Sequence, residues 1–125
     1  MGMVTSVTSL SRNGMSDWLI QRVSAVILAV YTVVVLGWLL SAGEVTFDNW
    51  SAFMGCLAMQ IANTFMIVAV AAHAWIGLWT VTTDYLTTRQ LGAAGTVVRL
   101  LAQLVIALLT LVYVLWGLVI VWGGA

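Results

Sequence analysis

The sequence is short of charge, proline and cysteine, and each shortage excludes a class of protein. Charged residues make up only 6% of the 125 residues, hydrophobic ones 63%, and the mean hydropathy is +1.13, far from the values of soluble domains. Proline is absent, so nothing forces a kink within a helix. Cys56 is the only cysteine, which excludes a disulfide framework or a cysteine metal cluster within the chain. We therefore expect an integral membrane protein with the lipid bilayer, and no nucleic acid, as its partner.

What the sequence does contain is three apolar segments, over residues 23–40, 57–80 and 97–121. Each has roughly the 20 residues that a helix needs to cross the hydrocarbon core. The segments are continuous and do not alternate, which argues against a β-barrel. The first is longer than the core of a signal peptide, so we expect it to be retained. The predicted fold is an all-α integral membrane protein of three transmembrane helices in a single domain, residues 1–125.

The positive charges predict the orientation. The four cationic residues are Arg12, Arg22, Arg89 and Arg99. Arg12 and Arg22 precede the first segment, Arg89 lies between the second and third, and Arg99 lies at the start of the third. The first loop, residues 41–50, has none and instead contains turn-forming residues. Because cytoplasmic loops carry the excess of arginine and lysine, we expect a cytoplasmic N-terminus and a periplasmic C-terminus.

His73 is the only histidine and lies inside the second apolar segment. An ionisable side chain at that depth is costly and usually functional. On a helix, Asp84 shares its face eleven residues further on, about 16 Å away. The neighbours of His73 are small, namely Ala69, Ala72, Ala74 and Gly77. They leave room for a bulky flat group or for a closely packed helix.

These features leave three interpretations of His73 open. The imidazole could form an interhelical hydrogen bond worth about 1 kcal/mol, like the one we expect of Gln103 in the third segment. It could be an axial haem ligand, in which case the second imidazole must come from a partner subunit or a symmetric dimer, because this chain has only one. In a small transporter, His73, Thr80 and Asp84 could form a proton relay along one helix face.

Two sequence blocks resemble a known family. Residues 73–79 are His-Ala-Trp-Ile-Gly-Leu-Trp and are followed by Thr83, Asp84 and Tyr85. A second block before the first segment contains Arg12, Asn13, Gly14, Asp17, Trp18 and Arg22. Together they resemble the hydrophobic membrane anchor of bacterial succinate dehydrogenase (complex II), over residues 11–122. The sequence departs from that pattern after Tyr85, where relatives have a lysine and a proline and this chain has Leu86 and Thr87.

The resemblance implies a four-subunit complex in the bacterial inner membrane, in which this multi-pass chain has no succinate-oxidising site of its own. A flavoprotein with FAD oxidises succinate, and an iron–sulfur protein passes electrons to ubiquinone. Fumarate reductases are close relatives. A second membrane anchor, the sister of this chain, supplies the other histidine of a shared haem b.

The resemblance also assigns roles to residues of this chain. His73 matches the family's haem iron ligand and Tyr85 its ubiquinone-contacting tyrosine. Asp84 would serve the quinone pocket, either relaying protons or pairing with an arginine of the sister anchor, unless it is a solvated residue at the helix end. Arg22 would contact a haem propionate or line the quinone entrance, unless it only extends to the membrane surface.

Overall fold

The computed structural model describes residues 14–123, so Arg12 and Asn13 lie outside the described part. Its elements are α1 (Gly14–Ser41), α2 (Phe47–Gly55), α3 (Leu57–Tyr85), α4 (Thr88–Leu91), the 3-10 turn η1 (Gly92–Ala94) and α5 (Gly95–Trp122). Within residues 14–123, the three long helices α1, α3 and α5 are long and apolar enough to cross a membrane. The prediction of three transmembrane helices is therefore confirmed.

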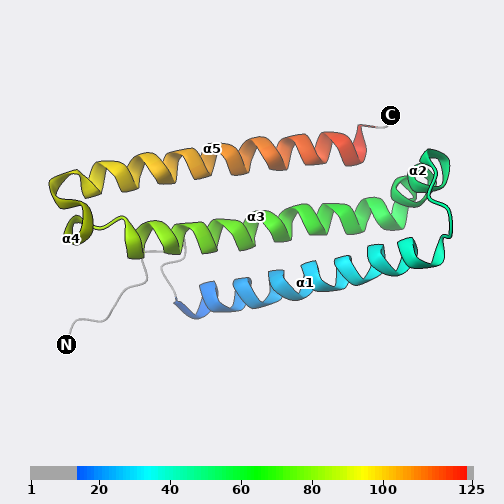
Figure 1. Ribbon diagram of the computed structural model, residues 1–125, viewed down its shortest axis with the longest axis horizontal. Coiled ribbons are helices and arrows are strands. Elements are labelled where there is room, and N and C mark those ends of the chain that lie inside the picture. Colours follow the sequence, from blue (N-terminus) through cyan, green and yellow to red (C-terminus); the bar gives the residue numbers. More distant parts are fainter. Residues whose placement is uncertain (1–13, 124–125) are drawn as a thin grey trace.

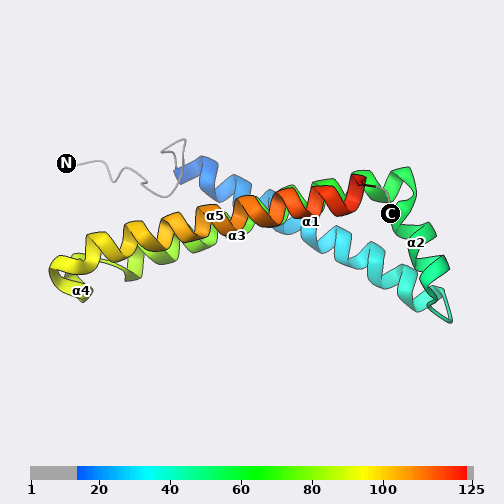
Figure 2. The ribbon, with the colours of Figure 1, turned by 90° about the horizontal axis from the view of Figure 1, so that it is seen from above.

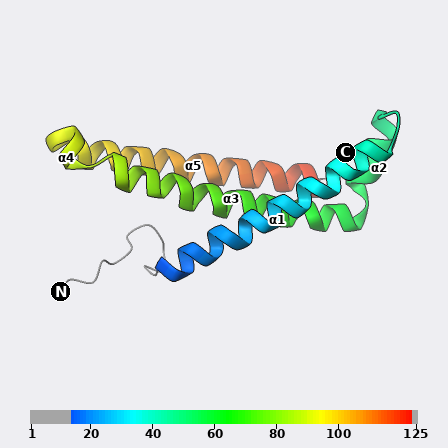
Figure 3. The ribbon, with the colours of Figure 1, turned by 60° about the horizontal axis from the view of Figure 1, so that its bottom comes forward.

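The helix α3 lies between α1 and α5 and runs antiparallel to both (Figure 1). The helix α5 follows α3 closely along its length, whereas α1 crosses α3 obliquely (Figures 2 and 3). The three long helices thus form a row and not a closed bundle. The start of α1, the end of α3 and α4 lie at one end of this row, and α2 lies at the other (Figure 1).

Few side chains are buried within the described part of the chain. In the most apolar 18-residue stretch of each long helix, 6% of the residues are buried in α1, 17% in α3 and none in α5. The buried apolar residues Met59, Ala69 and Ile76 all belong to α3. Most apolar side chains therefore point outward, as they do where lipid or another membrane protein covers the helices.

Two glycines of α5 permit close contacts with α3 and with the segment that follows it. A Cβ atom at Gly117 would lie 2.9 Å from Cδ1 of Ile67, so α5 packs closely on α3 there. A Cβ atom at Gly95 would lie 2.7 Å from the backbone oxygen of Thr87. The first turn of α5 is therefore packed directly against the segment that follows α3.

The prediction of an irregular loop over residues 41–50 is wrong in its second half, because α2 begins there. Its start is stabilised by a capping box in which the Thr46 backbone N–H donates to Asn49 Oδ1 (2.8 Å) and the Asn49 N–H donates to Thr46 Oγ1 (3.3 Å). The Trp38 ring of α1 stacks on Phe53 of α2 at 4.4 Å. Extended backbone at Cys56 then ends α2, and α3 starts at Leu57, where the second apolar segment starts.

The long helices extend beyond the apolar segments at most of their ends. The helix α1 begins at Gly14, α3 continues for five residues beyond Thr80 to Tyr85, and α5 begins at Gly95. Hydropathy marks the edge of the hydrocarbon core, whereas a helix continues into the headgroup region until capping or a turn stops it. This extension makes Asp84 and Tyr85 the last two residues of α3.

The two close contacts predict that a glycine-to-alanine substitution lowers the stability of the protein by different amounts at the two positions. Gly95→Ala should destabilise the protein by about 1–3 kcal/mol, because the backbone of Thr87 cannot move aside. Gly117→Ala should cost less, because the end of the Ile67 side chain can rotate away. Gly37→Ala is the control, since its Cβ would meet nothing within 4 Å. Thermal unfolding in detergent measures the difference, and a Gly95→Ala protein as stable as Gly37→Ala would contradict the packing.

Candidate functional site

His73 is half-buried in α3, and its imidazole bonds to α1. Nδ1 of His73 lies 3.2 Å from Oγ of Ser24, which is only 3% exposed. Among the described residues, no other side chain is hydrogen-bonded to the imidazole, so this contact occupies one ring nitrogen and leaves Nε2 available. The interhelical hydrogen bond expected in the first interpretation of His73 is present, and it is compatible with metal binding through the second nitrogen.

The face of α3 around His73 is closely covered by α1. Ala69 and Ile76 are buried, and Gly77 lies against Gln21, whose Nε2 would be 3.7 Å from a Cβ at position 77. The small residues near His73 were predicted to leave room either for a flat group or for a closely packed helix. At this point the space is occupied by the helix α1. Gln21 Oε1 is buried and has no hydrogen-bond partner within residues 14–123, which is unusual for a buried polar atom.

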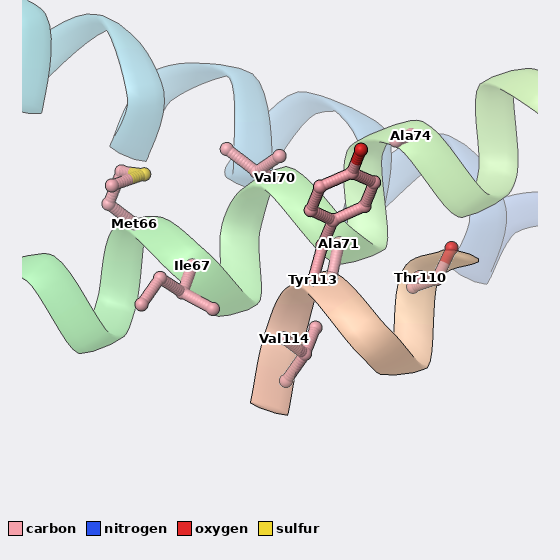
Figure 4. A pocket seen from close by; sticks show the side chains of 8 residues that line it. All are labelled: Met66, Ile67, Val70, Ala71, Ala74, Thr110, Tyr113 and Val114. Atoms are coloured by element: carbon pink, nitrogen blue, oxygen red, sulfur yellow. The ribbon is translucent and has the colours of Figure 1, made fainter. Parts of the chain in front are cut away.

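A small apolar cavity lies between α3 and α5. It has a volume of about 220 Å³, and its walls include Val70 and Ala74 of α3 and Thr110 and Tyr113 of α5, whereas His73 is not among its lining residues. Figure 4 shows the Tyr113 ring reaching from α5 toward Ala74. The volume is below the roughly 300–1,000 Å³ of typical small-molecule sites. This cavity alone is therefore too small for a cofactor.

The chain also provides only one candidate metal ligand at this depth. Within the described residues, no three His, Cys, Asp or Glu side chains are grouped so that they could hold a metal ion. A metal bound by His73 would need its remaining ligands from a porphyrin or from another molecule. The donor set fits a haem iron, which takes four nitrogens from the porphyrin and one or two axial ligands from protein.

Asp84 and Tyr85 end α3 at a different depth from His73. Both are exposed, Tyr85 to 64%. The Leu86 N–H donates to the Thr82 carbonyl and closes the helix just beyond them. Tyr85 is twelve residues from His73, about 18 Å along the axis. The structure therefore does not bring the two predicted sites together, and Asp84 and Tyr85 form a separate polar group at the helix end.

Arg22 lies on the opposite side of α1 from His73. Its guanidinium is 5.5 Å from the centroid of the Trp18 ring, within the range of a cation–π interaction. Arg22 is two residues from Ser24, which is about 200° around the helix. Since Ser24 contacts α3, Arg22 points away from α3. Arg22 does not adjoin His73, but it belongs to the first third of α1, whose start lies at the same end of the row as the end of α3 (Figure 1).

Polar side chains also connect α3 to both neighbours elsewhere. Gln103 Nε2 of α5 donates to Thr82 Oγ1 at 3.1 Å, which confirms the interhelical bond expected of Gln103. The Tyr31 hydroxyl of α1 donates to Asn63 Oδ1 at 2.6 Å, and Asn63 is buried. The sequence analysis missed Asn63, although an asparagine inside an apolar segment is itself a signal of such a bond.

A larger cavity lies around Asn63, at the end of the row remote from Tyr85. Its volume is about 700 Å³, and its lining includes Tyr31, Gln60, Asn63 and residues of α2. Gln60 Nε2 donates to the Val121 carbonyl of α5 at 3.1 Å, and Trp122 Nε1 donates to Thr64 Oγ1 at 2.8 Å. These bonds hold the remote ends of α3 and α5 together.

Comparison with known proteins agrees with this architecture of three long helices. The family described as Succinate dehydrogenase/Fumarate reductase transmembrane subunit matches residues 5–115. The chain is also similar to a Succinate dehydrogenase hydrophobic membrane anchor subunit of Coxiella burnetii, with 32% identity over 116 residues, 93% of this chain and 95% of that relative. The chain therefore belongs to the family of transmembrane subunits of succinate dehydrogenase and fumarate reductase.

Proposed function

We propose that this chain, together with a sister anchor, holds haem b and forms part of the site where a succinate dehydrogenase reduces ubiquinone. A flavoprotein and an iron–sulfur protein are the other members of the complex and contain the succinate-oxidising site, FAD and the iron–sulfur clusters. The observation that carries the proposal is the imidazole of His73, held in the middle of a membrane helix through Nδ1 with Nε2 available. Family membership supports the remaining parts of the proposal.

The surroundings of His73 fit a shared haem. His73 supplies one neutral imidazole, and the sister anchor would supply the second, because this chain has no other histidine. The cavity between α3 and α5 is too small to enclose a cofactor, so a haem would need space that another protein completes. When bound, a haem provides an iron centre that accepts and donates one electron at a time.

Tyr85 and Asp84 are suited to binding and protonating a quinone at the end of α3. The exposed phenol of Tyr85 can donate a hydrogen bond to a quinone carbonyl oxygen as negative charge develops there. Reduction to quinol consumes two electrons, which come from the iron–sulfur protein, and two protons. Asp84, exposed beside Tyr85, can pass protons from the aqueous phase or pair with an arginine of the sister anchor.

Arg22 would act from the outer side of α1. Its position opposite Ser24 supports contact with a ligand or protein that lies against α1 and not with one enclosed between α1 and α3. Trp18 holds the guanidinium near the same end as Tyr85. We therefore propose that Arg22 meets a haem propionate or lines the quinone entrance at the contact with the sister anchor.

A proton-conducting transporter is supported less well. The Thr80 hydroxyl donates to the Ile76 carbonyl at 2.8 Å, and His73 bonds to Ser24 of α1. Among the described residues, no hydrogen bond joins the side chains of His73, Thr80 and Asp84 to one another, so they do not form a continuous relay along α3.

The charges support an orientation with Tyr85 at the cytoplasmic face of the bacterial inner membrane. Arg22, Arg89 and Arg99 lie at that end of the row, whereas Glu44 and Asp48 lie in or beside α2 at the other. This orientation sets Tyr85 toward the side where the soluble proteins that oxidise succinate would dock.

His73→Ala should abolish or strongly change the low-spin haem absorbance of the purified complex, because one axial ligand of the iron is removed. The reduced-minus-oxidised spectrum measures this change. Tyr85→Phe, in which the change lies about 18 Å along the helix from His73, should keep the wild-type spectrum. A His73→Ala complex with an unchanged haem spectrum would show that this imidazole does not bind the iron.

Tyr85→Phe should lower quinone reduction at least about tenfold, because a hydrogen-bond donor to the developing charge is lost. Succinate oxidation with an artificial dye should be retained, since that reaction bypasses the quinone site. Tyr113→Phe is the control, as Tyr113 is equally exposed but lies on α5 beside the apolar cavity. Loss of both activities in Tyr85→Phe would indicate misassembly instead of a quinone contact.

The single cysteine allows the orientation to be tested directly. In a Cys56→Ser background, Glu44→Cys should react with a membrane-impermeant maleimide in intact spheroplasts, because it would face the periplasm. Ala93→Cys, exposed in η1, should react only after the membrane is permeabilised. The reverse pattern would place the end with Tyr85 outside the cell.

A further inference from the structure

We infer that Ser24 is a positioning residue for His73: its hydroxyl oxygen accepts a hydrogen bond from Nδ1–H and thereby leaves the lone pair on Nε2 for the iron. The inference rests on the proposed haem ligation by His73, and it deepens that proposal by assigning the tautomer and the residue that sets it. Neither family membership nor the sequence pattern assigns a role to Ser24.

The serine hydroxyl has a single hydrogen, which it can donate to only one of its two neighbours. Ser24 Oγ lies 3.1 Å from the carbonyl oxygen of Gln21 and 3.2 Å from Nδ1 of His73. A carbonyl oxygen can only accept, so the contact with Gln21 uses the hydroxyl hydrogen. The contact with His73 is then a hydrogen bond only if Nδ1 carries a hydrogen and donates it. A neutral imidazole protonated at Nδ1 has its lone pair on Nε2.

Two other hydroxyl groups in the protein make the same pair of contacts, and in both cases the partner on the neighbouring helix is a nitrogen that can only donate. The Thr64 hydroxyl donates to the Gln60 carbonyl at 2.8 Å and accepts from Trp122 Nε1 at 2.8 Å, and an indole nitrogen can only donate. The Thr82 hydroxyl likewise donates to the Trp79 carbonyl at 2.7 Å while accepting from Gln103 Nε2 at 3.1 Å.

These hydroxyls therefore share one geometry in this structure. Each donates to a carbonyl one turn earlier in its own helix and accepts from a side chain of the neighbouring helix. Ser24 follows this pattern, with the His73 imidazole as the donor.

Because Ser24 is buried, a water molecule could not easily replace its hydroxyl group as the hydrogen-bond acceptor. It is 3% exposed, and its oxygen is fixed by the backbone of α1. Histidines that bind metals usually donate the other ring N–H to a fixed acceptor, which sets the ring orientation and makes the ligating nitrogen a better electron donor. Loss of the acceptor should therefore weaken haem retention and favour the reduced iron, which raises the midpoint potential.

The sharpest test compares Ser24→Thr with Ser24→Val in the assembled complex. Threonine and valine have the same shape and differ in the hydroxyl group, so any packing strain is common to both. We expect Ser24→Val to lose haem to a haem-scavenging protein about tenfold faster than Ser24→Thr. Its midpoint potential should be higher and the electron paramagnetic resonance spectrum of its oxidised haem altered. Ser24→Thr should behave like the wild type.

Two further variants complete the design. Ser24→Ala adds no atoms and should match Ser24→Val in all three measurements. If Ser24→Thr or Ser24→Val does not assemble, the comparison of Ser24→Ala with the wild type replaces theirs. Ser41→Ala is the matched control, because the Ser41 hydroxyl also donates to a carbonyl one turn earlier, that of Trp38 at 3.0 Å, but is exposed near the remote end of α1. Ser41→Ala should leave haem retention, potential and spectrum unchanged.

The outcomes separate this inference from the proposed function. Equal haem retention, potential and spectrum in Ser24→Val, Ser24→Ala and the wild type would overturn the role of Ser24 while leaving His73 as a ligand. Absence of haem from the wild-type complex, or a wild-type spectrum in His73→Ala, would overturn the proposed ligation itself and this inference with it.

Discussion

The arrangement of the helices depends on one constraint: polar side chains inside a membrane need hydrogen-bond partners. In this protein such side chains are concentrated in α3. Asn63 and His73 bond to α1, whereas Thr64 and Thr82 bond to α5. Each neighbour thus satisfies a different set of groups on the central helix. Since burial of apolar surface gives helices in lipid little reason to associate, these bonds and the close contact at Gly117 explain why α3 lies between the other two.

The sequence allowed the three spanning helices and the special character of His73 to be predicted, because both follow from local composition. It did not reveal Ser24 as the partner of His73, since a serine in an apolar segment has the same local pattern whether it packs, bonds to its own backbone or accepts from another helix. The apolar segments also end before the helices do, as at Tyr85, because hydropathy follows the lipid boundary. The helix α2 was missed because a capping box uses the same polar residues as a turn.

The candidate site residues lie at different depths and on different faces of the helices. His73 is half-buried against Ser24 of α1, whereas Tyr85 and Arg22 are exposed. In the proposed function, this chain would supply one half of each contact, and other proteins of the complex would supply the complementary halves. This division agrees with the small buried fraction of the long helices, whose outer faces would be covered only on assembly.

The contact at Gly95 has a mechanical consequence. The segment after Tyr85 passes against the first turn of α5 so tightly that no side-chain atom fits between them. Thr87 lies two residues after Tyr85, so the end of α3 and the beginning of α5 meet in a compact corner next to the tyrosine. In the proposed function, a larger residue at position 95 would shift this corner and so alter quinone binding without touching the ligand.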